Sequence, residues 1–300
     1  MNMELLKLLE NIRSPFLDSI IGIITSLGEE TVAVVVICMI YWCISKRTAY
    51  IIGVAFFLSG ITVQCMKICL RINRPWVIEP SLNPVPSAME RSSGYSFPSG
   101  HTQAATALYG SLGAVIRLRT IKVVCFLIPF LVAFSRLYLG VHTILDVAAS
   151  LAISFFVVFI TVRLFSNDSV SKKLDLLLPL IMILYTVVVI VIAAVLFSNG
   201  TIEERYLSDC LKSSGAGIGF AVGMYVERKY IQFSTKAKSI LWQVVKFVCG
   251  LAGVFIIQEG LKLIVGTGLI IDAARYCLII LWAMAFFPLI IKRFFEVPCE

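Results

Sequence analysis

Long apolar runs constrain this chain more than any other feature of its sequence. A helix needs about 20 mainly apolar residues to cross the hydrocarbon core of a bilayer, and the run from Leu176 to Leu196 is of that kind. Hydrophobic residues make up 59% of the chain, and its mean hydropathy of +0.94 lies far outside ordinary globular usage. The sequence therefore predicts an all-α, polytopic transmembrane bundle without a separate soluble domain.

The apolar runs and their polar flanks predict about nine transmembrane helices. The segment before the first of them, residues 1–28, alternates apolar and charged side chains, and we expect it to lie as an amphipathic helix in the membrane interface. Its second half is apolar enough to dip into the bilayer instead. The predicted spans cover residues 29–45, 47–70, 100–117, 121–138, 142–164, 174–197, 214–229, 240–263 and 268–291.

The distribution of positive charge indicates topology. A net charge of +8 is compatible with nucleic-acid binding, but the Lys and Arg residues form short clusters between apolar runs rather than one basic face, so no nucleic-acid partner is expected. The clusters fall in every second connection, which the positive-inside rule places in the cytoplasm. They are Lys46/Arg47, Arg117/Arg119/Lys122, Arg163/Lys172/Lys173, Arg228/Lys229/Lys236/Lys238 and Lys292/Arg293.

Polar residues of unusual types gather where this topology reaches the opposite face of the membrane. The loop of residues 71–98 is long and proline-rich, and the Arg74-Pro75 pair is expected to break the helix before it. Further polar residues follow this loop and surround a later turn at the same face. The whole set is Lys67, Arg74, Ser99, Gly100, His101, Arg136, His142 and Asp146.

The two histidines of the chain both belong to this set. His142 and Asp146 are four residues apart, so a fifth span that begins near Val141 would put them on one helix face. The carboxylate can then hold one imidazole nitrogen and leave the other to attack. His101 is expected beside the same group as an acid.

The remaining members of the set suit a bound phosphate. Arg74 and Arg136 offer planar forks that match phosphate oxygens, and Lys67 adds a compact positive charge. Ser99 is a natural N-cap for the third predicted span, so the amides near Gly100 would point outward at a helix N-terminus. The three cations can neutralise the charge that magnesium neutralises elsewhere, so neither a metal ion nor another cofactor is predicted.

Each residue of the set also has a simpler interpretation. Arg136 alone could anchor a helix end in the headgroup region, and His142 with Asp146 alone could form a buried structural pair. Ser99 followed by Gly100 is by itself an ordinary helix cap. The conjunction at one face of an otherwise apolar chain is what favours phosphoryl transfer.

At these residues the sequence resembles the type 2 phosphatidic acid phosphatase (PAP2) superfamily. The three blocks of that signature are Lys67-Ile-Cys-Leu-Arg-Ile-Asn-Arg74-Pro75, Pro98-Ser99-Gly100-His101 and Ser135-Arg136-Leu-Tyr-Leu-Gly-Val-His142-Thr-Ile-Leu-Asp146. The resemblance covers residues from about 45 to 165. It implies a PAP2-like catalytic membrane core in residues 29–170. The last third of the chain falls outside the resemblance, and the apolar runs of residues 171–300 predict additional transmembrane helices there.

The resemblance also implies a role for each residue. His142 would attack phosphorus, Asp146 would orient it, and His101 would protonate the leaving oxygen. The implied phosphate-binding residues are Lys67, Arg74, Ser99, Gly100 and Arg136.

The expected activity is hydrolysis of a phosphomonoester or pyrophosphate of a lipid through a phosphohistidine, because the chain lacks a hydrophilic substrate domain and the site lies at the bilayer surface. Phosphatidic acid, phosphatidylglycerophosphate and undecaprenyl pyrophosphate are substrates of the family. Four alternatives stay open: a soluble sugar phosphate as in the nine-span glucose-6-phosphatase branch, transfer of phosphate to another acceptor, a catalytically silent lipid-binding relative, and a transporter.

Location and the role of the last spans follow from the same patterns. The lean chain suggests a bacterial cytoplasmic membrane with an outward-facing site, although a luminal site in the endoplasmic reticulum would leave a similar sequence. The last two spans carry four charged residues toward their outer end, which suit either a substrate entrance or structural pairs. They are Glu259, Lys262, Asp272 and Arg275.

Overall fold

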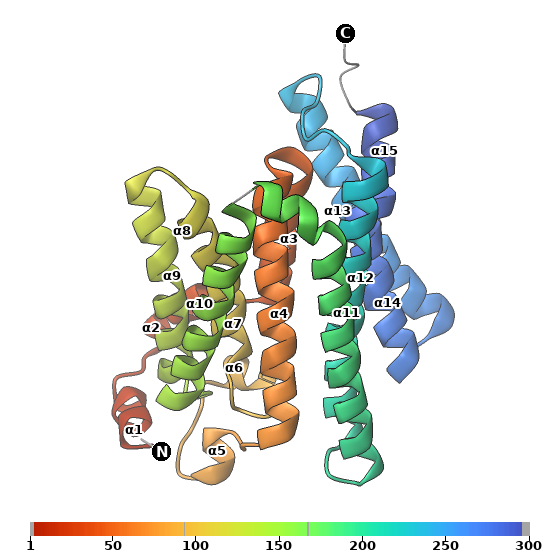
Figure 1. Cartoon of the computed structure of the whole chain (residues 1–300). Helices are drawn as coiled ribbons and strands as arrows, with labels where there is room; N and C mark the ends of the chain where they lie inside the picture. The colour runs from red at the N-terminus through yellow and green to blue at the C-terminus, as the bar shows by residue number, and fades with distance from the viewer. Residues whose placement is uncertain (1–2, 93, 167, 296–300) are drawn as a thin grey trace. The chain divides into compact units, whose positions relative to one another are not determined.

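The computed structural model describes residues 3–92, 94–166 and 168–295, and for residues 168–174 it describes the backbone only. Helices, and no strands, make up the regular structure of the described chain (Figure 1). In chain order they are α1 (Met3–Asn11), α2 (Pro15–Ser26), α3 (Glu30–Cys43), α4 (Lys46–Leu70), α5 (Pro75–Ile78), α6 (Pro86–Glu90), α7 (Gly100–Ala105), η1 (Thr106–Gly110), α8 (Ser111–Val115), α9 (Arg119–Tyr138), α10 (Ile144–Ser166), α11 (Asp168–Ser198), α12 (Glu204–Val226), η2 (Glu227–Ile231), α13 (Ile240–Val265), α14 (Leu269–Leu281), η3 (Trp282–Phe286) and α15 (Phe287–Phe294).

The predicted all-α membrane class is confirmed, whereas the predicted number of spans is not. Six helices in the described residues are long and apolar enough to cross a bilayer, and α2 with α3 makes a seventh if this pair, bent by 45°, counts as one span. The run from α7 to α8 is short. In α12, glycines and charged residues dilute the apolar ones. The figure of nine spans therefore stays a prediction.

The chain divides into two compact units. Unit 1 comprises residues 1–34 and 62–162, and unit 2 comprises residues 35–61 and 163–300. All eight residues of the predicted site belong to unit 1.

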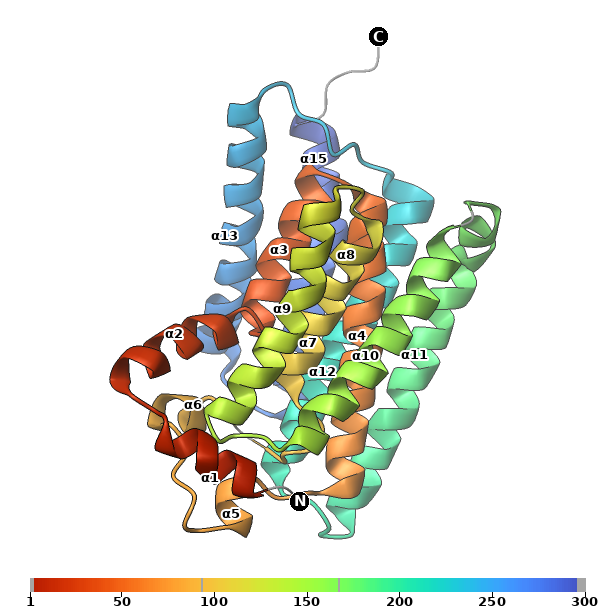
Figure 2. The ribbon, with the colours of Figure 1, turned by 90° about the vertical axis from the view of Figure 1, so that its left-hand side faces the viewer.

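In unit 1 the N-terminal helices lie across the longer ones. Figure 2 shows α1 and α2 inclined to α7, α9 and α10, and α2 packs against α9. The turn after α2 approaches α7 closely at Gly28, where a Cβ atom would lie 2.7 Å from the carbonyl oxygen of His101. Glycine is therefore required for this approach, which fixes the start of α7.

The loop of residues 71–98 folds over one end of these helices. Helix α4 ends at Leu70, and α5 begins with Pro75 at its first position, as the Arg74-Pro75 pair predicts. Helix α6 follows and packs on the end of α9, where Ala88 joins Tyr138, Leu139 and Val141 in a buried apolar cluster. This apolar contact holds the polar residues that follow α6 above the site.

Unit 2 is held together by small residues and by ion pairs. Glycines at four-residue intervals on α12, at positions 215, 219 and 223, face α14 and η3, and a Cβ at Gly219 would lie 2.6 Å from the carbonyl oxygen of Cys277. Such spacing lets two helix backbones approach closely. Charges pair within the unit: the half-buried Lys46 with the buried Glu227 at 2.7 Å, and the buried Arg275 with the buried Asp272 at 2.7 Å. Of the basic cluster predicted around Arg163, Lys172 and Lys173 lie outside the residues whose side chains are described.

Candidate active site

A direct contact between Arg74 and His142 forms the centre of the site. Nη1 of Arg74 lies 2.9 Å from Nε2 of His142, although the two residues are 68 positions apart. The same Nη1 donates to the carbonyl oxygen of Val141 at 3.0 Å, and Nε of Arg74 donates to that of Gly94 at 3.0 Å. A guanidinium group has no acceptor, so Nε2 of His142 is the acceptor and carries no proton.

The other ring nitrogen of His142 faces two oxygens. Nδ1 lies 3.4 Å from Oδ2 of Asp146 and 3.4 Å from Oγ of Ser96. Ser96 donates its hydroxyl proton to the same Oδ2 at 2.6 Å, so its oxygen can accept from Nδ1. The imidazole is thereby held with its proton on Nδ1 and the lone pair of Nε2 directed at the cation.

Asp146 also caps the helix on which it stands. Its Oδ2 accepts from the backbone N–H of Thr143 at 2.7 Å, and the Thr143 hydroxyl accepts from the N–H of Asp146 at 3.4 Å. This reciprocal arrangement is a capping box with Asp at its third position. The expectation that the helix begins near Val141 is therefore wrong: α10 begins at Ile144, and His142 precedes it. The turn before the helix, rather than a shared helix face, brings His142 to Asp146.

Burial determines the protonation state of His142, which lies in the turn between two membrane-crossing helices. Only 2% of the residue is exposed. Its pKa lies well below the ordinary value of 6.5, first because burial penalises the charged imidazolium and second because Arg74, Arg136 and Lys67 add positive charge. A lowered pKa leaves the imidazole neutral at neutral pH, which is the form a nucleophile needs.

Arg136 is held by neutral partners. It is 1% exposed, and its Nη1 donates to the Thr25 hydroxyl at 2.9 Å while Nη2 donates to the Ser92 hydroxyl at 2.7 Å. The Ser92 hydroxyl in turn donates a hydrogen bond to the carbonyl oxygen of Ala88 at 2.6 Å. The guanidinium is fixed by α2 and by the end of α6, and neither hydroxyl cancels its charge.

The start of α7 contributes Ser99, Gly100 and His101. The predicted N-cap is confirmed: Oγ of Ser99 accepts from the N–H of Thr102 at 3.4 Å and from its hydroxyl at 3.0 Å. The Ser99 N–H donates to the backbone oxygen of Asp146 at 3.2 Å, which ties this turn to α10. Nζ of Lys67 lies 3.8 Å from the place a Cβ at Gly100 would occupy. The Lys67 ammonium group thus stands above the first turn of α7.

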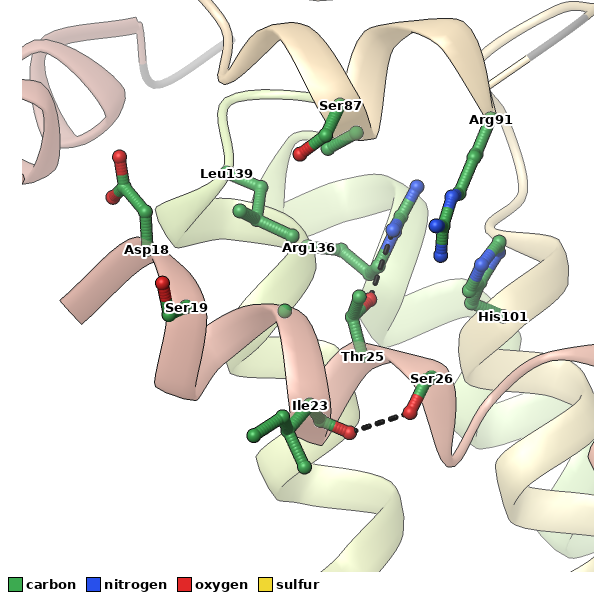
Figure 3. Close-up of a pocket in the computed structure, with 12 residues that line it drawn as sticks. Asp18, Ser19, Ile23, Thr25, Ser26, Ser87, Arg91, His101, Arg136 and Leu139 are labelled. Carbon is green, nitrogen blue, oxygen red and sulfur yellow. Dashed lines mark hydrogen bonds between the residues drawn. The ribbon is translucent and has the colours of Figure 1, made fainter. Parts of the chain in front are cut away.

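A cavity of about 410 Å³ opens beside these groups (Figure 3). His101 and Arg136 reach it from α7 and α9, and α2 forms one wall, which Figure 3 shows with Thr25 bonded to Arg136. The cavity reaches the buried Arg136, whereas Lys67, Arg74 and His142 are not part of its lining. Its lining comprises Asp18, Ser19, Gly22, Ile23, Thr25, Ser26, Ser87, Ala88, Arg91, His101, Arg136 and Leu139.

Several residues of this arrangement were not expected from the sequence. Ser96 and Ser92 lie in the loop and carry no signal of their own, while Thr25 lies in the segment predicted to be interfacial. The Thr143-Ile-Leu-Asp146 pattern did contain a readable signal, that of a capping box. The described residues hold no cluster of three or more His, Cys, Asp or Glu side chains suited to a metal ion.

Comparison with known proteins assigns the family. A model of the PAP2 superfamily matches residues 48–170, and a model of the transmembrane extension of PAP2 superfamily phosphatases matches residues 211–296. Together they cover more than half of the chain. This integral membrane protein belongs to the PAP2 superfamily, as its three sequence blocks predict.

Three individual proteins are similar to this chain. An undecaprenyl-diphosphatase of Sulfolobus acidocaldarius is 29% identical over 178 residues, which are 57% of this chain and 82% of that protein. The crystal structure of Aquifex aeolicus LpxE is 28% identical with a TM-score of 0.49, and covers 54% of this chain and 94% of its own. The crystal structure of a PAP2-type phosphatidylglycerolphosphate phosphatase from Bacillus subtilis is 24% identical with a TM-score of 0.45, and the match covers 53% of this chain and 81% of that one.

Proposed function

We propose that this protein is a lipid phosphate phosphatase that works through a phosphohistidine on His142. The single observation that carries this proposal is the 2.9 Å contact between the unprotonated Nε2 of His142 and the guanidinium of Arg74. A phosphate seated on Arg74 has its phosphorus next to a neutral, oriented imidazole nitrogen. Membership of the PAP2 superfamily and the name of the undecaprenyl-diphosphatase relative support the same activity.

The catalytic cycle has two steps in this proposal. Arg74 turns from Nε2 to the phosphate oxygens, and Nε2 attacks phosphorus while the bond to the leaving oxygen breaks. His101 gives that oxygen a proton, and Asp146 stabilises the charged imidazole through Nδ1. Water then cleaves the phosphorus–nitrogen bond and releases inorganic phosphate.

The surroundings of the cavity favour a lipid over a soluble substrate. Helix α2 lines the cavity, and four of its large apolar side chains are exposed: Phe16 at 73%, Leu17 at 37%, Ile20 at 39% and Ile23 at 70%. Ile23 belongs both to this exposed surface and to the cavity wall. An apolar helix at the rim lets acyl or prenyl chains remain in the membrane while the phosphate enters.

Positive side chains are proposed to supply the charge neutralisation in place of a metal ion. Lys67, Arg74 and Arg136 are the cations whose charges reach His142, and fixed cations stabilise the charge of the transferring phosphoryl group. We further propose a bacterial cytoplasmic membrane with the cavity on the outer face, because the positive clusters of the sequence fall in the alternate connections.

The test is phosphate release by the purified, detergent-solubilised protein in excess EDTA. The substrates are phosphatidic acid, phosphatidylglycerophosphate, undecaprenyl pyrophosphate and glucose 6-phosphate, each also given to His142→Ala. We expect release from at least one lipid that survives EDTA and disappears in the variant. Loss of release in EDTA would refute metal independence, and equal release by His142→Ala would refute the phosphohistidine.

A further inference from the structure

Arg91 is a cation of the cavity that lies outside the three sequence blocks. It follows α6 directly as the C-cap of that helix, and its side chain lines the cavity together with His101 and Arg136. Figure 3 shows Arg91 and His101 at the same end of the cavity. The proposed chemistry gives Arg91 no task, because the phosphate to be transferred already has three cations.

The backbone of Arg91 is fixed although its side chain reaches the surface. Its neighbour Ser92 accepts from Arg136 at 2.7 Å and donates to Ala88. The Arg91 side chain is 65% exposed and pairs through Nη1 with Oε1 of Glu29 at 2.9 Å. An ion pair this exposed contributes little energy, so a bound anion can displace it.

The position of Arg91 corresponds to the leaving side of the reaction. His101 protonates the leaving oxygen in the proposed mechanism, so whatever is attached to that oxygen lies near His101 and therefore near Arg91. From a monophosphate the leaving group is a neutral lipid alcohol. From a diphosphate it is a lipid monophosphate, whose negative charge needs a cation there.

We propose that Arg91 binds the lipid-proximal phosphate of a lipid diphosphate and thereby makes diphosphates the preferred substrate class. This inference rests on the proposed function. His142 attacks the terminal phosphorus, the bond from that phosphorus to the bridging oxygen breaks, and the bridging oxygen takes the proton of His101 and leaves as part of the lipid monophosphate. Arg91 holds that monophosphate through its fork of N–H donors.

The remaining polar groups of the cavity are compatible with this assignment. The hydroxyl of Ser87 lies on the lining and can donate a hydrogen bond to a phosphate oxygen, whereas that of Ser26 already donates to the carbonyl oxygen of Ile23 at 2.8 Å. Among the residues that the structure describes, Asp18 is the one carboxylate on the lining, and it accepts a hydrogen bond from the Tyr138 hydroxyl at 3.0 Å. Figure 3 draws Asp18 at the other end of the cavity from Arg91 and His101, so it does not oppose an anion there.

The experiment compares a prenyl diphosphate with the prenyl monophosphate of the same chain length, by initial rates of phosphate release. We expect Arg91→Gln to lower kcat/KM on the diphosphate by about 10- to 100-fold and on the monophosphate by less than about twofold. Arg91→Lys keeps the charge without the fork and is expected to lie in between. Arg119→Gln, an exposed arginine at the start of α9, is the matched control and should change neither rate.

A fourth variant separates binding from a structural role. Glu29→Gln removes the ion pair but leaves Arg91 in place, so it should keep the diphosphate preference. Equal loss on both substrates in Arg91→Gln, no loss at all, or the same selective loss in Glu29→Gln would overturn the inference while the proposed function stands. Wild-type protein that releases phosphate from neither lipid would instead refute the proposed function, and the inference with it.

Discussion

Buried charges occur in both units of the molecule, but they are held in opposite ways. In unit 2, Arg275 meets Asp272 at 2.7 Å, with Lys212 at 3.8 Å from the same carboxylate. In unit 1, Arg136 donates to two hydroxyls and Arg74 to two backbone carbonyl oxygens. The first arrangement neutralises charge, whereas the two hydroxyls at Arg136 fix a guanidinium without neutralising it, as the proposed phosphate site requires.

The partners of a buried charge indicate whether it stabilises the fold or suits the proposed chemistry. The Arg275–Asp272 pair lies within α14, and Lys212 of α12 approaches the same carboxylate, so the cluster links the two helices. Losing a partner from a buried pair leaves a poorly compensated charge. A guanidinium held by neutral acceptors keeps its orientation and a strong field, which is what electrostatic catalysis requires. Of the charges proposed for a substrate entrance, Asp272 and Arg275 form such a pair, which favours the structural interpretation.

The largest effect is expected from Asp146→Asn, which tests the proposed chemistry in unit 1. The Asp146 carboxylate contacts Thr143, Ser96 and His142 through the same oxygen, Oδ2. The amide oxygen of Asn can take the position of Oδ2, so the substitution removes the negative charge and keeps the geometry. We expect kcat/KM to fall by on the order of 10³- to 10⁴-fold with little change in Tm. Ser96→Ala, which removes one hydrogen bond to the carboxylate but leaves the charge of Asp146 in place, is the control for a smaller effect. A loss below about tenfold in Asp146→Asn would contradict the role of Asp146.

The comparison between the units is tested directly by two matched substitutions. Arg136→Gln should lower kcat/KM by about 10²- to 10³-fold while the protein remains folded, because it removes a cation from the site. Arg275→Gln should lower the free energy of unfolding by about 3 kcal/mol, because Asp272 loses its nearer partner and keeps Lys212 at 3.8 Å, with turnover of the folded fraction retained. Phosphate-release rates and thermal unfolding in detergent measure both. Loss of stability alone in Arg136→Gln, together with loss of turnover alone in Arg275→Gln, would contradict this difference between the units.

Two glycines give the smallest expected effects and the finest comparison. Gly28→Ala places a Cβ 2.7 Å from the His101 carbonyl oxygen, so we expect the start of α7 to shift and kcat/KM to fall about tenfold. Gly219→Ala places a Cβ 2.6 Å from the Cys277 carbonyl oxygen, and we expect a loss of about 1–3 kcal/mol in stability with activity per folded molecule unchanged. Equal effects of both on activity would show that the approach at Gly28 does not position His101.

The membrane class, most of the helical segments and the chemical groups could be predicted from the sequence. Hydropathy over about 20 residues is a local property, so the membrane class and the helices could be predicted from it. The cap at Ser99 and the break before Pro75 were also predictable, because each depends on a few neighbouring residues. The three blocks predicted the superfamily for the same reason, because each is a short, contiguous motif of the sequence.

The contacts between those groups depend on the tertiary structure and could not be predicted from the sequence. Arg74 contacts His142 across 68 positions, and Arg136 contacts Thr25 across 111. Hydropathy and helix periodicity do not specify such contacts, because they depend on how separate helices pack. The cavity wall formed by α2 and the place of Arg91 beside His101 follow from packing in the same way. Local patterns supplied the reactive groups, and the packing of unit 1 set their distances and their orientation.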